Sequence, residues 1–515
     1  MVTAQTFTRS TAITEGTTSF YGFAELPFDL PEQLHELNPW WAGKPGRVLP
    51  SYRRWAFREV KSKLQAGLAP AVVVRGPRQV GKTTLQEQLI EDLLAEGVPP
   101  THLFRVQFDD IPALRALKQP ILTLARWYQR YILRETFNET ARQGRPAYIF
   151  LDEVQNLSDW APQVKALVDT WTVKVLVTGS SALRIEAGRD SLAGRITTVE
   201  MGPFLVREIA ELNFQTSLKP LLGSNGLEDL KEPDFWQHVV QFGIENREDR
   251  DRAFSLFSER GGYPVAYVSG ASVPWAQVAD QLNETVIQRV IQHDLRMGDK
   301  GRKRDERLLE EVFRLVCRYA GQAPGQAVYV QELHRSMGAN IGWQRVLSYL
   351  KFLEGSLLVA LIAPLEIRLK RRRGNYKLCL SDHGLRASWL QEIIPLDPVQ
   401  LEKSSHLTDL AGHLAESVVG YFFNGLPHLD VAHFPERGAE PEVDFVLTIG
   451  DRRIPVEVKY RRHIDQHRDT LGLRSFVEKA VNNAPFGVLV TQMDGPPLSD
   501  PRIISVPLSS LLLMR

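Results

Sequence analysis

A glycine-rich segment set between a strand and a helix constrains this chain most. It comprises nine consecutive residues: Gly76, Pro77, Arg78, Gln79, Val80, Gly81, Lys82, Thr83 and Thr84. An apolar run at residues 71–74 precedes it, and a helix-forming stretch at residues 85–94 follows. Glycines let backbone N–H groups curl around phosphates, which the positive end of the helix also attracts, while the lysine reaches the terminal phosphates and the first threonine binds Mg²⁺. The sequence therefore predicts a site for ATP with Mg²⁺.

Acidic and hydroxyl side chains follow two further strand-like runs. Asp152 and Glu153 directly follow the run at residues 147–151, and Ser180 lies shortly after the run at residues 174–178. We expect Asp152 to hold Mg²⁺ through water, Glu153 to polarise the attacking water, and the Ser180 hydroxyl to touch the γ-phosphate or that water. Alternatively, the acids only cap a buried strand and the serine only forms a turn. With the glycine-rich loop upstream, the pattern favours ATP hydrolysis.

Strand-like and helix-like segments alternate from the glycine-rich loop to residue 178, which predicts an α/β fold with a parallel sheet covered by helices. The chain has 515 residues, too many for one core. Its formal net charge is only +1, so any nucleic-acid contact has to come from a local patch. Two isolated cysteines and the lack of an apolar run of about 18 residues predict a cytoplasmic protein without a membrane span.

Several ordered motifs resemble those of a prokaryotic AAA-type ATPase family whose members carry a C-terminal conserved domain of unknown function. Besides the loop, they are Phe108-Asp109-Asp110, Leu151-Asp152-Glu153-Val154-Gln155, Thr178-Gly179-Ser180-Ser181, Ser191-Leu192-Ala193-Gly194-Arg195, Gly261-Gly262-Tyr263-Pro264, Gln292-His293-Asp294-Leu295 and Ser381-Asp382-His383-Gly384-Leu385. The resemblance implies that Arg195 is a candidate to reach the γ-phosphate, either in cis or as an arginine finger from a neighbouring subunit. The second case requires a homo-oligomer. An ordinary surface or ion-paired arginine is the alternative, because Arg184 and Arg189 lie nearby.

The region from about residue 305 to 390 has the element order of a winged helix. We expect a helix at 306–319, a short segment at 328–330, a helix at 331–337, a longer helix at 343–354, and strands at 357–363 and 376–380. Five cations lie between the two strands: Arg368, Lys370, Arg371, Arg372 and Arg373. The longer helix adds Gln344, Arg345 and Lys351. This pattern favours DNA binding through phosphate contacts, although a solvated loop or a protein contact would have the same composition.

The last region carries acids and a lysine on two predicted adjacent strands. Asp444 lies on the first strand, and Glu457 and Lys459 share one face of the second, while Glu416 lies on the preceding helix. The order is similar to that of PD-(D/E)XK restriction-endonuclease-like nucleases, which implies a divalent metal, Mg²⁺ or Mn²⁺, and a catalytic Lys459. The sequence departs from these nucleases at Glu442-Val443-Asp444, where they often show Pro-Asp. Some folds of this kind keep the acids only as structure, or bind DNA without cutting it.

These observations lead to two functional hypotheses. In the first, an ATPase rearranges a DNA-engaging C-terminal half that is also a metal-dependent nuclease. In the second, a nucleotide-gated regulatory or assembly protein holds DNA or a protein partner and cuts nothing. The predicted divisions are an N-terminal arm at residues 1–45, an AAA-type core at 46–215, a helical lid or linker at 216–304, a winged-helix domain at 305–390 and a nuclease-like domain at 391–515.

Overall fold

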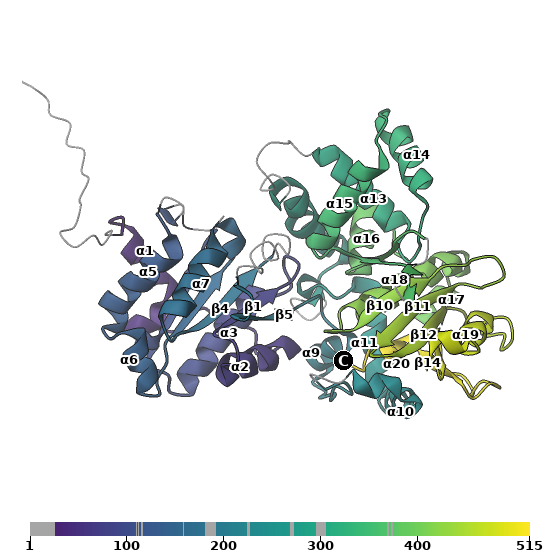
Figure 1. Cartoon of the computed structure of the whole chain (residues 1–515), viewed down its shortest axis with the longest axis horizontal. Helices are drawn as coiled ribbons and strands as arrows, with labels where there is room; N and C mark the ends of the chain where they lie inside the picture. Colours follow the sequence, from purple (N-terminus) through teal and green to yellow (C-terminus); the bar gives the residue numbers. More distant parts are fainter. Residues whose placement is uncertain are drawn as a thin grey trace, which may run out of the picture.

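A computed structural model describes most of the chain after residue 25. The described residues are 26–109, 111, 113–114, 117–157, 159–180, 192–223, 227–267, 272–294, 305–367, 370–371 and 374–515. Figure 1 shows an N-terminal lobe around β1 and β4, a helical unit around α13, α14 and α15, and a second sheet around β11 and β12. The helical unit and the second sheet lie side by side, and the N-terminal lobe adjoins them near α9.

The N-terminal lobe contains a five-stranded parallel sheet in the order β2-β3-β4-β1-β5. The strands are β1 (Ala71–Arg75), β2 (Leu103–Gln107), β3 (Tyr148–Asp152), β4 (Lys174–Gly179) and β5 (Ile196–Glu200). The helices around it are α2 (Trp55–Ala66), α3 (Lys82–Ala95), α5 (Pro120–Tyr128), α6 (Phe137–Arg142) and α7 (Trp160–Thr170). The predicted α/β fold with a helix-covered parallel sheet is confirmed.

Alternate residues of each central strand face opposite layers of helices. Val72 and Val74 of β1 pack in one hydrophobic cluster with α2 and α3, whereas Ala71 and Val73 pack in another with α5 and α7. Because both faces of the sheet are covered, the central strands are largely apolar on both faces instead of alternating with polar residues. Strand β5, which was not predicted, is less buried and contains two threonines.

Part of the expected N-terminal arm covers the open edge of the sheet. Helix α1 (Leu30–Leu37) and a short turn, η1 (Pro39–Ala42), lie beside β2. The Asn38 side chain donates to the carbonyl of Arg105 over 2.9 Å and accepts from its backbone N–H over 2.7 Å. The indoles of Trp40 and Trp41 both donate to the Leu103 carbonyl. The segment thus satisfies backbone groups that an edge strand leaves unpaired; residues 1–25 lie outside the described residues.

Helices dominate the middle of the chain. They are α9 (Val206–Phe214), α10 (Pro233–Glu245), α11 (Arg247–Arg260), α12 (Trp275–Leu282), α13 (Glu306–Arg318), α14 (Gln326–Met337), α15 (Trp343–Gly355) and α16 (His383–Leu390). The separate segment predicted at residues 328–330 is wrong, because these residues belong to the first turns of α14. We call α13, α14 and α15 the three-helix unit. In the described ranges, no helix combines the length and apolar character needed to cross a membrane.

The C-terminal sheet has the order β10-β11-β12-β13-β14, antiparallel from β10 to β12 and parallel from β12 to β14. Its strands are β10 (Asp430–Phe434), β11 (Val443–Ile449), β12 (Arg452–Lys459), β13 (Gly487–Thr491) and β14 (Ile503–Pro507). The accompanying helices are α17 (Pro398–Glu402), α18 (Thr408–Asn424), α19 (Leu471–Val477) and α20 (Leu508–Leu511). Strands β10 and β14 were not predicted.

Two short antiparallel strands join the three-helix unit to the C-terminal sheet. Strands β6 (Val359–Ile362) and β9 (Lys377–Leu380) are buried along their whole length. A Cβ atom on Gly420 of α18 would lie 2.3 Å from the Cys379 sulfur, so only glycine permits this close approach of β9. The base of the predicted wing is therefore interior. Beyond it, β7 (Glu366–Ile367) pairs with β8 (Lys370–Arg371).

Most of the basic residues predicted for the tip of the wing are not among the described residues. Arg368, Arg372 and Arg373 lie outside the described residues, and only the backbone of Lys370 and Arg371 is described.

Candidate nucleotide-binding site and C-terminal carboxylate cluster

The glycine-rich loop connects β1 to α3 at the carboxyl edge of the N-terminal sheet. A Cβ atom on Gly76 would lie 2.1 Å from the Met201 carbonyl oxygen, so this position accepts only glycine. Gly81 has a φ of 95° and immediately precedes the first residue of α3. Gln79 also has a positive φ, 63°. The loop is thus held in a tight, left-handed path that leads its backbone into the helix N-terminus.

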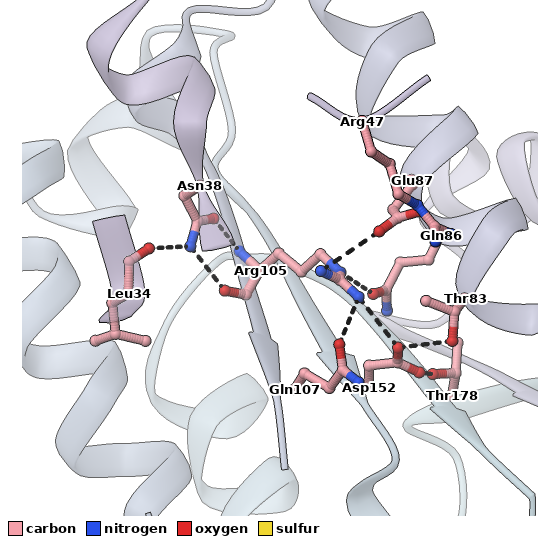
Figure 2. Close-up of polar contacts among 10 residues, drawn as sticks. All are labelled: Leu34, Asn38, Arg47, Thr83, Gln86, Glu87, Arg105, Gln107, Asp152 and Thr178. Carbon is pink, nitrogen blue, oxygen red and sulfur yellow. Dashed lines mark hydrogen bonds and ion pairs between the residues drawn. The ribbon is translucent and has the colours of Figure 1, made fainter. Parts of the chain in front are cut away.

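The predicted lysine and threonine lie at this helix start. The Lys82 ammonium donates to the carbonyls of Gly76 and Pro77 over 2.9 and 2.7 Å. The Thr83 hydroxyl donates to Asp152 Oδ2 over 2.9 Å, which joins α3 to the end of β3. Asp152 is fully buried, and its other oxygen, Oδ1, accepts from the Thr178 hydroxyl at the end of β4. The structure therefore brings together side chains from three elements, as Figure 2 shows.

The residues of this loop suit ATP and Mg²⁺. A glycine-rich turn at a helix N-terminus binds anionic phosphates, and the lysine beside it supplies a positive charge. The neighbouring hydroxyl of Thr83 and carboxylate of Asp152 are oxygen ligands of the kind that Mg²⁺ prefers. Chemically, the donor set fits the nucleotide and its metal ion.

Glu153 is held by a small network of hydrogen bonds. Its Oε2 accepts from the Ser180 hydroxyl over 3.2 Å and also from the Gln155 amide. The Gln155 amide in turn donates to the Ser180 oxygen over 3.0 Å. Glu153 has a φ of 52°, a conformation that costs free energy in a non-glycine residue and is common at functional sites. The structure thus places Glu153 and Ser180 together, with Gln155 as a supporting residue to which the sequence had assigned no role.

Arg105 is a second residue to which the sequence had assigned no role. It lies in β2, is almost fully buried, and its guanidinium lies 3.3 Å from Asp152 Oδ2 and 3.5 Å from Glu87 Oε1. It also donates to the side chains of Gln86 and Gln107. Figure 2 shows that its backbone pairs with Asn38, so one residue joins the N-terminal segment to the carboxylate of the candidate site. A charged residue in the middle of a mostly apolar strand was the available signal.

Arg195 lies at the opposite edge of the sheet. It directly precedes β5, and its carbonyl accepts from the N–H of Ala71, the first residue of β1. The glycine-rich loop follows the last residue of β1, roughly 16 Å away at the usual rise of a strand. Arg195 pairs instead with Asp169 over 2.6 Å, and both side chains are partly exposed. The structure therefore does not bring Arg195 to the glycine-rich loop of the same subunit, because the length of β1 separates the two positions.

A buried arginine, Arg54, connects the glycine-rich loop to helix α9. Arg54, just before α2, donates to the carbonyls of Val80 and Gly202, both over 2.8 Å. It also forms a buried ion pair of 2.6 Å with Glu208 of α9. Charge-assisted bonds of this kind are the stronger hydrogen bonds in proteins. The glycine-rich loop is thereby fixed to the start of α9, the helix that leads toward the C-terminal half.

The structure also brings together the four residues predicted for the C-terminal site. Phe445 pairs with Val456 in the antiparallel ladder, which sets Asp444 opposite Glu457. The Asp444 N–H lies 3.4 Å from Glu457 Oε2, and the Lys459 ammonium lies 2.5 Å from Glu457 Oε1. Glu416 of α18 joins them through a shared neighbour, the ammonium of Lys377 in β9, to which the sequence had assigned no role.

The Lys377 ammonium lies among the carboxylates. It is 2.5 Å from Asp444 Oδ1, 2.7 Å from Glu416 Oε2 and 3.9 Å from Glu442 Oε1. Although burial lowers it, these carboxylates together raise the pKa of Lys377 well above its usual value. Burial raises the pKa of Glu457 to about 8, and the charge of Asp444 adds to the effect. Among the described residues, no group of three or more acids, histidines or cysteines is arranged to hold a metal ion.

The parallel sheet and the glycine-rich loop of the N-terminal lobe are those of a P-loop fold. A family model described as "AAA domain" matches residues 69–210, and one described as "Domain of unknown function (DUF8612)" matches residues 252–394. Similar curated proteins are themselves uncharacterized. Rv2008c of Mycobacterium tuberculosis is 25% identical over 337 residues, 64% of this chain and 58% of that protein. MJ1637 of Methanocaldococcus jannaschii is 23% identical over 392 residues, 73% of this chain and 72% of that protein.

The chain spans about 58% of the length of the mycobacterial relatives that it matches. Among solved structures, it is similar to the Walker-type ATPase PABY2304 of Pyrococcus abyssi. That similarity has 15% identity and a TM-score of 0.41, and covers 66% of this chain and 95% of the other.

Proposed function

We propose that this chain binds and hydrolyses ATP with Mg²⁺ at the carboxyl edge of its N-terminal sheet. The observation that carries the proposal is the convergence of Thr83, Asp152 and Glu153 beside the glycine-rich loop. Thr83 and Asp152 would hold the ion, and bound Mg²⁺ neutralises negative charge on phosphate oxygens. The loop amides and Lys82 would bind the phosphates. Thr84 and the loop residues from Gly76 to Val80 would shape this cradle.

In this proposal, Glu153 orients the attacking water and accepts its proton. The carboxylate has to point in one direction to do so, and the hydrogen bonds from Ser180 and Gln155 restrict it. Ser180 thereby has a second role beside its predicted contact with the γ-phosphate or the water.

Nucleotide binding and turnover test the proposal directly. The wild-type chain should hydrolyse ATP only with a divalent ion, and Lys82→Ala should lose nucleotide binding in a titration with a fluorescent ATP analogue. Lys118→Ala is a matched control, because Lys118 is an exposed lysine of the same lobe. Wild-type nucleotide affinity in Lys82→Ala would remove the loop from the site.

Arg195 retains one proposed role, as a residue supplied to a neighbouring subunit of a homo-oligomer. Its partly exposed position at the amino edge of the sheet supports a contact in trans. Arginine fingers contribute about a thousandfold or more to turnover. Arg195→Ala should therefore lose most ATPase activity, and mixing it with inactive Lys82→Ala should restore part, because mixed interfaces pair an intact loop with an intact arginine. No restoration in mixed oligomers would refute the trans role.

We further propose that the C-terminal half engages DNA through a winged-helix arrangement. The order of three helices followed by the β6 and β9 strands supports it, as do the exposed Arg345 and Lys351 on α15. Reversing the charges of Arg371, Arg372 and Arg373 should weaken duplex binding and reduce its salt dependence. Arg247→Glu, on an exposed arginine outside this unit, is the control. Unchanged binding and salt dependence would exclude the wing from the interface.

Between the two hypotheses for the C-terminal half, we propose the one without DNA cleavage. The convergence of Glu416, Asp444, Glu457 and Lys459 supports a nuclease, but the Lys377 ammonium among their carboxylates supports a non-cutting role. Plasmid incubated with ATP and Mg²⁺ or Mn²⁺ should stay intact with wild type and with Lys459→Ala. Cutting by wild type alone would establish the nuclease, whereas cutting by both would show contamination.

A further inference from the structure

The carboxylate cluster of the C-terminal half already contains a cation. Lys377 enters it from β9, and its side chain is only 2% exposed. The same nitrogen contacts Asp444 of β11 and Glu416 of α18, over 2.5 and 2.7 Å. An ammonium has three N–H donors, so it can donate to both of these carboxylates. The carboxylate of Glu442 lies 3.9 Å from the same nitrogen and adds a further electrostatic attraction.

The position of this ammonium is fixed by packing on several sides. The Lys377 backbone pairs with Ile362 in the buried β6–β9 ladder, and its nitrogen lies 5.0 Å from the centre of the Phe445 ring. The neighbouring Leu380 N–H donates to the Ser417 hydroxyl of α18 over 2.9 Å. Close packing of Cys379 on Gly420 holds the same strand against the same helix. A strand held at these points keeps the lysine side chain buried.

The carboxylate oxygens are already used in ways that do not fit a divalent metal. Asp444 Oδ1 accepts from Lys377, and its Oδ2 accepts from the Val458 N–H over 2.8 Å. Glu457 Oε1 accepts from Lys459, and its Oε2 lies 3.4 Å from the Asp444 N–H. A metal bound by these acids would stand close to a buried ammonium, and like charges in a buried site repel strongly. The expected nuclease metal therefore does not fit the residues present.

We propose that Lys377 is the resident cation of this cluster, in place of a divalent metal, and that it locks strand β9, which contacts α13 of the three-helix unit, to the C-terminal sheet. The lysine and its two acids come from β9, α18 and β11, so each ion pair also fixes how these elements sit together. Removing the ammonium leaves converging carboxylates uncompensated, which is the arrangement that attracts Mn²⁺. The inference extends the proposed non-cutting role, and metal binding is measured apart from DNA cleavage so that the two can fail separately.

Manganese binding to the full chain tests this inference. All variants carry Lys82→Ala, and free Mn²⁺ is followed by electron paramagnetic resonance without nucleotide. With Lys377 intact, Asp444→Asn should not change Mn²⁺ binding. Lys377→Met should bind one more Mn²⁺ per chain than the variant with Lys377 intact. The affinity of the carboxylate cluster for Mn²⁺ should be at least about tenfold higher in Lys377→Met than with Lys377 intact. Adding Asp444→Asn should abolish this additional Mn²⁺ binding. Lys479→Met is the matched control, because Lys479 pairs with Glu440 in the same half but is more exposed.

Two results of the manganese titration would overturn the proposal. One is Mn²⁺ binding by the chain with intact Lys377 that disappears in Asp444→Asn, because metal and ammonium would then coexist. The other is a folded Lys377→Met variant without additional Mn²⁺. If Lys377→Met does not fold, the combination of Lys377→Met with Asp444→Asn and Glu416→Gln should restore folding, since the two acids that the ammonium contacts then carry no charge. Failure of that combined variant to fold would also refute Lys377 as the partner of these acids.

Discussion

The molecule contains two sets of acids at strand ends, and their partners differ. Around Asp152 and Glu153, most donors are neutral: the hydroxyls of Thr83, Thr178 and Ser180 and the amide of Gln155, with the Arg105 guanidinium beside one oxygen of Asp152. Around Asp444 and Glu457, the donors include two ammonium groups, Lys377 and Lys459. Neutral donors orient a carboxylate and leave its charge for a cation, whereas an ammonium compensates it. The partners, more than the acids, distinguish the two sites.

The largest expected effect of this difference is on stability. Lys377→Met should lower the free energy of unfolding by about 3 to 5 kcal/mol, because it leaves buried carboxylates without their cation. Urea unfolding measures the loss, and Lys479→Met should change little, since its ion pair is more exposed. If Lys377→Met were as stable as wild type without added metal, the ammonium would not compensate the cluster, and the contrast between the two sites would disappear.

The next effect is on turnover, with the same substitution made at each site. Glu153→Gln should reduce kcat for ATP about a hundredfold or more while retaining ATP binding, because an amide cannot accept the proton of the water. Glu457→Gln should leave kcat unchanged, since Glu457 lies in the other sheet. Steady-state phosphate release measures both. Unaltered turnover in Glu153→Gln would show that another residue positions the water.

The acids of the two sites were predictable from the sequence because strand ends are local features. Asp152 follows one buried apolar run, and the hydroxyl residue Ser180 follows another. Parallel strands bring their C-terminal ends to the same edge of the sheet, which places the two residues together. Asp444 and Glu457 were predicted in the same way, from two adjacent strands joined by a short turn. The glycine-rich loop was predictable for the same reason, since its strand, turn and helix are consecutive.

The partners were not predictable because they arrive from distant segments. Lys377 is 67 residues from Asp444, and its strand had been predicted as part of a winged helix. Arg105 is 47 residues from Asp152 in a strand whose periodicity indicates burial but not a neighbour. The place of Arg195 depends on the strand order, which periodicity does not give. Local pattern thus predicted where each acid lies, while the tertiary contacts determine its charge balance.

The pH dependence of stability is a smaller expected effect of the C-terminal cluster. Burial and Asp444 raise the pKa of Glu457 from 4.5 to about 8, so the folded chain holds this proton more tightly than the unfolded chain. The stability from this group is complete below pH 4.5 and is lost as pH rises through about 8. The raised pKa of His413, beside Glu416, acts in the same direction, and the lowered pKa of Asp444 acts only in acid.

Urea unfolding at about pH 6 and pH 8.5 should therefore differ by about 2 kcal/mol in wild type. Glu457→Gln should reduce this difference, because the amide does not titrate, and Glu91→Gln on the exposed side of α3 is a matched control in the N-terminal lobe. A pH dependence that is the same in wild type and Glu457→Gln would mean that Glu457 is already ionised at neutral pH, with the Lys459 ammonium compensating its charge.

The smallest effect concerns the neutral partners of the N-terminal site. Gln155→Ala removes the amide that bonds both Glu153 and Ser180, and should lower kcat about tenfold, the value of one hydrogen bond to a charged group. The KM for ATP should change little, because Gln155 lies with the water-orienting group and not with the phosphate loop. Gln155→Glu sharpens the test, since it replaces a neutral donor with a second acid beside Glu153. If the neutral amide of Gln155 keeps Glu153 oriented, the kcat of Gln155→Glu should be no higher than that of Gln155→Ala. A wild-type kcat in both variants would assign the orientation of Glu153 to Ser180 alone.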